Sequence, residues 1–131
     1  MKSLFNMSAA TIAAMALLSS FSHMANLHAA ELIMIEQEHC PWCEAFHDEI
    51  GGIYHKTTEG KRAPLRRIDI HDEPPRDLET MTRGNYTPTF VLWEDGKEIS
   101  RIRGYPGDEF FWFMLGQMLD KLPNSGKEPT G

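Results

Sequence analysis

The chain of 131 residues has only two cysteines, no excess of basic residues and no long hydrophobic run after Ala30. Two cysteines are too few for a small domain held together by disulfides. The formal net charge is −6, which argues against a nucleic-acid-binding face. No segment after Ala30 is apolar over the length that a bilayer requires. These absences leave a small globular domain whose cysteine pair is the first candidate for chemistry.

The first residues have the pattern of an export signal. A single charged residue, Lys2, precedes a small and apolar segment at 9–18. That segment is too short to span a bilayer but has the length of the apolar part of a signal peptide. Small residues at Ala29 and Ala30 favour cleavage after one of them, so we expect residues 1–29 to be the signal peptide. The mature protein is then periplasmic, with an uncleaved membrane anchor as the alternative.

Hydrophobic periodicity divides the rest of the chain into strands and helices. Strands are expected at 31–36, 65–70, 90–93 and 98–103, and helices at 41–56, 78–83 and 108–122. The segment 57–64 is expected to be a loop, and residues 123–131 a disordered tail. Asp108 is expected to cap the last helix. The dense apolar run at 110–115 predicts that this helix is buried nearly all round.

The order β-α-β, short helix, β-β-α predicts one α/β domain over residues 30–122. The first two strands should be parallel, because a helix connects them. Asp95-Gly96 favours a hairpin between the last two strands. Ile99 and Ile102 would face opposite sides of a regular strand, which predicts a bulge in that hairpin. The result is a four-stranded mixed sheet with flanking helices.

The two cysteines, Cys40 and Cys43, lie between the first strand and the first helix. Free backbone N–H groups and the helix dipole favour an anion there, which should lower the pKa of the Cys40 thiol. Pro41 suits the first helical turn, where its missing N–H costs nothing. Cys43 lies one turn further on and should be less exposed. The spacing predicts thiol–disulfide exchange, with Cys40 as the nucleophile and Cys43 as the resolving thiol.

Other roles for the pair stay open on the residues alone. A purely structural disulfide would close too small a loop to add much stability. A zinc or copper site would need His39 or His47 as a further ligand. Glu44 stands directly after the second cysteine, where a c-type haem site needs histidine. Trp42, between the cysteines, should be exposed and is a candidate anchor for a partner.

Over roughly residues 32–122 the chain resembles the thioredoxin-fold family. The likeness rests on the strand–CPWC–helix order, on "YTPTF" at 86–90 and on Gly104 after the hairpin. It implies that the Thr87–Pro88 bond is cis and faces the cysteines, and that Thr87 pairs with an extended substrate strand. The substrate groove would then consist of Pro41, Trp42, Thr87 and Pro88.

A narrower likeness is to the small periplasmic thioredoxins of bacterial sulfur-oxidation (Sox) clusters, the SoxS type. It is carried by "EQEHCPWC", "PLRRIDI" and "YTPTFVLWEDGKEISRIRGYPGDEFFW". It implies a protein-disulfide reductase without a dissociable cofactor or metal, whose electrons reside in the dithiol. Its donor would be a membrane thiol transporter of the CcdA or DsbD kind, and its substrate the carrier protein of a sulfur-oxidation system.

The resemblance leaves the direction of electron flow and the partner's identity open. A DsbA-like thiol oxidant is one alternative, and a non-enzymatic CxxC metal-binding module is another. We do not expect glutathione as a partner, because it is not the thiol buffer of a bacterial periplasm. We expect a monomer.

The sequence departs from ordinary thioredoxin in three places. The residues between the cysteines are Pro41 and Trp42 rather than Gly-Pro. Met34 stands where thioredoxins carry a buried acid, which leaves Glu36, Glu38 or water to take the proton of the second cysteine. The first strand and helix of full thioredoxin have no room here, so the fold should be a minimal version.

Overall fold

Four short runs of apolar and β-branched residues form the strands of a single sheet. They are β1 (Glu31–Glu36), β2 (Leu65–Asp69), β3 (Thr89–Glu94) and β4 (Lys97–Arg103). Their order across the sheet is β2-β1-β3-β4; β1 and β2 are parallel and the other neighbours antiparallel. This computed structural model describes residues 30–123 and confirms the predicted mixed sheet. The expected signal peptide (1–29) and the tail from 124 onward lie outside the described residues.

The hairpin between β3 and β4 has the predicted tight turn. Asp95 and Gly96 both have positive φ angles, 50° and 71°, as a two-residue hairpin turn of the primed type requires. The pairing register shifts between Leu92 and Trp93, which confirms the predicted irregularity in this hairpin.

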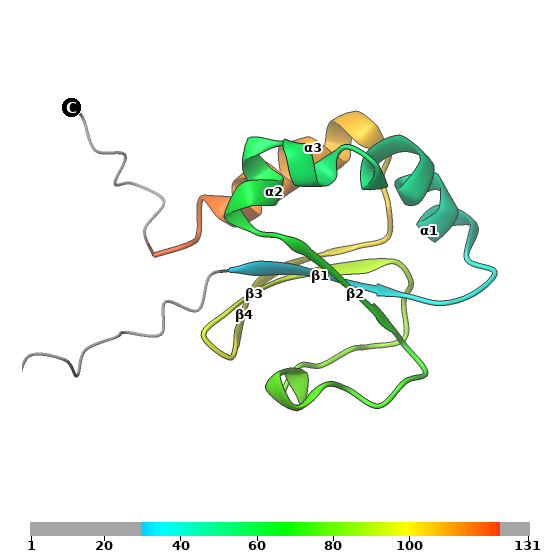
Figure 1. Cartoon of the computed structure of the whole chain (residues 1–131), viewed down its shortest axis with the longest axis vertical. Coiled ribbons are helices and arrows are strands. Elements are labelled where there is room, and N and C mark those ends of the chain that lie inside the picture. The colour runs from blue at the N-terminus through cyan, green and yellow to red at the C-terminus, as the bar shows by residue number, and fades with distance from the viewer. Residues whose placement is uncertain (1–29, 124–131) are drawn as a thin grey trace, which may run out of the picture.

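The two faces of the sheet are covered in different ways. Figure 1 shows the helices α1 (Pro41–Phe46), α2 (Thr58–Arg62) and α3 (Asp108–Leu119) on one face. The opposite face is covered by the segment that contains the short 3-10 helix η3 (Arg76–Leu78), which buries Leu78 against the sheet. The helix-side cluster includes Leu32, Met34, Phe90 and Leu92; the opposite cluster includes Ile33, Ile35, Val91 and Trp93. The alternation follows from the two-residue period of a strand.

The first predicted helix, 41–56, is not continuous. It consists of α1, a π-helical turn η1 (His47–Gly51) and, after an interruption, a 3-10 turn η2 (Tyr54–Lys56). The interruption is at Gly52 and Ile53, directly after η1 ends at Gly51. After proline, glycine is the residue least favourable in a helix. The helix that carries the cysteine pair is therefore shorter than its apolar periodicity predicts.

Two further predictions about short elements were wrong. The segment 57–64 contains α2, whose first turn is capped by Thr57 Oγ1 accepting from Gly60 N over 3.0 Å. The helix expected at 78–83 is instead η3, which begins directly after two prolines. Elements of three to five residues are too short to show a hydrophobic period.

The last helix, α3, begins at Asp108 as its first helical residue and has Gly107 as its cap, so Asp108 is not the N-cap. Its buried stripe is Phe111, Leu115, Met118 and Leu119. Phe110 and Phe113 are 65% and 63% exposed, so the prediction of burial all round was wrong. The helix lies on the outside of the sheet and can turn only one stripe toward it. In the described part of the chain, residues 30–123, no helix has both the length and the apolar character needed to cross a membrane.

Candidate active site

The cysteine pair lies at the junction that the sequence predicts. β1 ends at Glu36, the chain turns with His39 at a positive φ of 57°, and Cys40 becomes the N-cap of α1. Cys40 has extended backbone angles, and Pro41 occupies the first helical turn. Cys40 therefore lies between the end of β1 and the start of α1, as the CPWC motif predicts.

Cys40 and Cys43 form a disulfide with their Cα atoms 5.2 Å apart. The main-chain N–H of Cys43 donates to Sγ of Cys40 over 3.2 Å. When the bond is reduced, a donor in this position stabilises the negative charge of a Cys40 thiolate. The two residues are 4% and 3% exposed, so the expected difference in exposure between them is small.

An aromatic cluster fixes the active-site helix on the sheet. The ring of Phe46, at the end of α1, lies 4.8 Å from the Phe90 ring and 5.2 Å from the Phe111 ring. Tyr105 packs edge-on against Phe46, and its hydroxyl donates to Glu49 Oε2 over 2.6 Å. Burial and this carboxylate raise the pKa of Tyr105 above its ordinary value, so the phenol stays a donor. The cluster ties α1 to β3 and α3 at once.

The Thr87–Pro88 peptide bond is cis, as the resemblance implies. The next residue, Thr89, pairs with Ile35 near the end of β1. Thr87 and Pro88 therefore lie at the end of the sheet where β1 finishes and the cysteine loop begins. Gly104 N donates to Pro88 O over 2.7 Å and joins the end of β4 to the same place. The fold therefore brings the CPWC motif, the "YTPTF" segment and Gly104 together at one end of the sheet.

Exposed aromatic side chains lie next to the sequence motifs at this end of the sheet. Trp42 is 63% exposed, as predicted from its place between the cysteines, and Pro41 is exposed beside it. Tyr86, directly before Thr87, is 65% exposed. Exposed aromatic side chains are frequent anchors at protein interfaces. The roles of Pro41, Trp42, Thr87 and Pro88 in substrate binding stay predictions.

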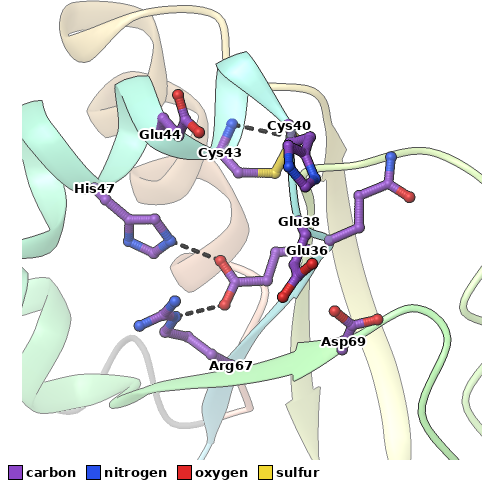
Figure 2. Close-up of a pocket in the computed structure, with 10 residues that line it drawn as sticks. Glu36, Glu38, Cys40, Cys43, Glu44, His47, Arg67 and Asp69 are labelled. Atoms are coloured by element: carbon purple, nitrogen blue, oxygen red, sulfur yellow. Dashed lines mark hydrogen bonds and ion pairs between the residues drawn. A yellow bond between two sulfur atoms is a disulfide. The ribbon is translucent and has the colours of Figure 1, made fainter.

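A cavity of about 590 Å³ opens beside the disulfide. Figure 2 shows the Glu36 carboxylate in it, turned toward the His47 ring and the Arg67 guanidinium. His47 Nε2 donates to Glu36 Oε2 over 2.6 Å, and Arg67 Nε donates to Glu36 Oε1 over 2.6 Å. The cavity is lined by Glu36, Gln37, Glu38, His39, Cys40, Cys43, Glu44, His47, Arg67 and Asp69.

Sequence reasoning missed that His47 and Arg67 meet on Glu36. His47 follows Cys43 by four residues, which puts both on one helical face, and this spacing was the available signal. Arg67 lies in the strand expected at 65–70, and the sequence does not indicate which way its side chain points. The His47 ring nitrogen that faces the cavity is engaged by Glu36 rather than turned to the sulfurs. Within residues 30–123, no group of three or more His, Cys, Asp and Glu residues is arranged to hold a metal ion.

Comparison with known proteins gives a consistent result. Residues 20–119 match a family described as a thioredoxin-like domain. The periplasmic thioredoxin SoxS from Paracoccus pantotrophus, solved in its reduced form, is 39% identical. The match covers 70% of this chain and 97% of that chain, with a TM-score of 0.67.

More distant thioredoxins share the fold alone. One from Thermus thermophilus is 21% identical over 75% of this chain and 79% of that chain, with a TM-score of 0.54. One from Malassezia sympodialis is 18% identical over 70% of this chain and 76% of that chain, with a TM-score of 0.52. No curated protein matches the chain in sequence.

Proposed function

The chain belongs to the thioredoxin-like family, and from that premise we propose that it is a periplasmic thiol:disulfide reductase acting on a partner protein. A thioredoxin fold with a CxxC pair is the machinery of a thiol–disulfide oxidoreductase in general. The observation that carries the finer proposal is the 39% identity with a periplasmic thioredoxin, SoxS, over 97% of that chain.

The proposed reaction moves two electrons from the dithiol to the partner. The Cys40 thiolate attacks one sulfur of a partner disulfide; a Cys40–partner bond forms, the partner's bond breaks, and the leaving thiolate takes a proton. The Cys43 thiolate then attacks Sγ of Cys40. The mixed disulfide breaks, the second partner thiol leaves reduced, and Cys40–Cys43 is left oxidised. No dissociable cofactor enters the reaction.

The proposed substrate groove lies at the end of the sheet, between the CPWC motif and the segment that contains Thr87 and Pro88. Trp42 and Pro41 are exposed on one side of it, and Thr87 and Pro88 directly precede β3 on the other. The backbone at Thr87 would pair with an extended segment of the partner, a form of strand addition. Its main-chain groups would fix the segment, and Trp42 would supply apolar contact area.

A reductant in an oxidising compartment must itself be re-reduced. We propose that a membrane thiol transporter of the CcdA or DsbD kind supplies the electrons. We propose that a cysteine of the carrier protein of a sulfur-oxidation system receives them. Both assignments follow from the resemblance of the sequence to the thioredoxins of sulfur-oxidation clusters.

A DsbA-like oxidant is the second candidate, and one observation favours it. The hydrogen bond from Cys43 N to Cys40 Sγ stabilises a thiolate, and a stabilised thiolate makes the reduced form the more stable one. Direction then depends on the reduction potential. A value near about −270 mV marks a thioredoxin-like donor, and one near about −120 mV marks a DsbA-like oxidant.

The deciding experiment traps the redox state of the two cysteines in living cells by rapid acidification and alkylation. For a reductant we expect mostly dithiol, turning to disulfide when the membrane transporter is deleted. A protein that is mostly disulfide in both strains would overturn the reductant assignment and favour the oxidant. Wild-type extract that is fully reduced with dithiothreitol before alkylation, and extract oxidised with diamide, mark the dithiol and disulfide forms.

A further inference from the structure

The resolving step creates a proton problem inside this site. Thiolate, not thiol, is the attacking species, so Cys43 must lose its proton before it can attack Cys40. Cys43 is only 3% exposed. Cys43 belongs to the helix-side core cluster, which among the described residues contains no carboxylate and no histidine that could accept a proton. The proton must therefore leave toward the cavity, which Cys43 also lines.

Among the carboxylates that line the cavity, Glu36 is the one that two cavity side chains hold. Its side chain is 15% exposed, and His47 and Arg67 each donate to one of its oxygens over 2.6 Å. These two donors come from η1 and β2, so the carboxylate is fixed from two elements while its own strand ends just before the cysteine loop. Glu38, Glu44 and Asp69 also line the cavity. Glu38 and Glu44 are exposed, and Asp69 Oδ1 accepts instead from the main-chain N–H of His71 over 2.8 Å.

We propose that Glu36 accepts the proton of the Cys43 thiol through water in the cavity, and that His47 and Arg67 are the positioning residues that hold its carboxylate. The inference rests on the proposed thiol–disulfide exchange. A carboxylate oxygen has more than one lone pair, so Glu36 can accept from its two fixed donors and from water at once. A cavity of about 590 Å³ has room for water, since one molecule occupies about 30 Å³ in the liquid.

The charges around Glu36 come from three parts of the fold. The groups that line the cavity are Glu38 and His39 of the loop, Glu44 and His47 of the helical segment α1–η1, and Arg67 and Asp69 of β2. Of these groups, His47 and Arg67 bond directly to the Glu36 carboxylate.

Atoms and electrons balance in the proposed step. The S–H bond of Cys43 breaks, and its proton passes through water to a Glu36 oxygen. The freed thiolate attacks Sγ of Cys40, the new Cys40–Cys43 bond forms, and the bond to the partner breaks. The partner sulfur leaves as a thiolate and takes a proton from solvent. In the reverse direction, protonated Glu36 returns its proton to Cys43 when the disulfide is opened.

The test separates attack from resolution with the aromatic disulfide dithiobis(nitrobenzoate). The fully reduced protein releases one coloured thiolate when Cys40 attacks and a second when Cys43 resolves the mixed disulfide. In stopped flow at pH 7, Glu36→Gln should slow the second phase about tenfold to 100-fold and leave the first within about twofold. The difference should close above about pH 9, where a thiol ionises without help.

Matched variants give the control. Glu38→Gln removes a carboxylate from the mouth of the same cavity and should leave both phases within about twofold of wild type. Glu36→Ala should slow the second phase, and added acetate should restore it in proportion to concentration. Rescue by a free carboxylate is a response that a merely structural role of Glu36 would not give, and it decides the question if Glu36→Gln does not fold.

An unchanged second phase and pH profile in Glu36→Gln, or a slow Glu36→Ala that acetate does not restore, would overturn the proposal. Failure of the underlying function is a different result. In that case the wild-type protein would show no second phase at all and would reduce no protein disulfide.

Discussion

The main-chain N–H of Cys43 lies 3.2 Å from Sγ of Cys40 and donates to it. Because this donor belongs to the main chain, replacing the side chain at position 43 leaves it in place. We expect Cys43→Ser to accumulate mixed disulfides with partners through Cys40, and Cys40→Ser to trap almost none. Non-reducing electrophoresis detects the mixed disulfides, and mass spectrometry identifies the cysteine through which each one forms. Traps that form through Cys43 instead would reverse the assigned roles.

Trp42 offers a test of the proposed groove. Its side chain is 63% exposed, so Trp42→Ala should change the free energy of unfolding by less than about 0.5 kcal/mol. If it anchors the partner, the mutation should raise the KM for a protein disulfide several-fold, by about 1 kcal/mol or more of lost binding. Phe113→Ala is the matched control, because Phe113 is an aromatic residue on α3 with the same exposure. Equal effects of the two substitutions on KM would argue against a specific role for Trp42.

Gly60 is required by a close approach in α2. A Cβ atom there would lie 1.9 Å from the main-chain oxygen of Tyr54, and backbone atoms cannot yield cheaply. We expect Gly60→Ala to destabilise the protein by at least about 2 kcal/mol in urea unfolding. Gly116→Ala is the control: it lies inside α3, where a Cβ would meet nothing within 4 Å. That substitution should stabilise by about 0.5–1 kcal/mol. Similar losses at both positions would contradict the steric explanation.

The hairpin carries an ion pair whose contribution depends on pH. Arg101 Nε donates to Glu98 Oε1 over 2.6 Å, and this hydrogen bond, with the Arg101 charge, holds the pKa of Glu98 below its ordinary value of 4.5. The folded-state pKa is the lower one, so the pair stabilises the protein above the ordinary glutamate range. That stability is lost as the pH falls through the folded-state pKa.

We expect Glu98→Gln to lower the free energy of unfolding at pH 7 by less than about 1 kcal/mol, because the pair is partly exposed. The difference from wild type should shrink as the pH is lowered below 4.5. Urea unfolding across this range measures it, and a double-mutant cycle with Arg101→Gln isolates the pair. A difference that grows in acid would have the wrong sign for this mechanism.

The four strands and the cysteine pair could be predicted from the sequence because each has a strong local signal. Strand β1 is a run of large apolar residues that leads directly into the CPWC motif, and Asp95-Gly96 specifies the hairpin turn. The predictions that failed concern segments whose sequence has no clear hydrophobic periodicity. Five residues of α2 around a buried glycine give no amphipathic pattern, and the apolar sequence of α3 does not say which stripe will face the sheet.

The site around the cysteines was predicted only in part, for a geometric reason. Arg67 reaches Glu36 because β1 and β2 pair with Met34 opposite Arg67 and Glu36 opposite Asp69. This register depends on how the chain between the two strands folds back, and that chain includes the unexpected helix α2. Without the register, Arg67 is one of two adjacent arginines on a strand, and its side chain has no assigned direction.

The sheet order also decides which main-chain groups are left at its rims. β2 and β4 are the outer strands, and each is rich in charge. β2 carries Arg66, Arg67 and Asp69, and β4 carries Lys97, Glu98, Arg101 and Arg103. A further strand, from a second copy or from an unfolded neighbour, would have to align beside these charges and strip water from them. Charged rims of this kind resist the edge-to-edge aggregation to which open sheets are prone.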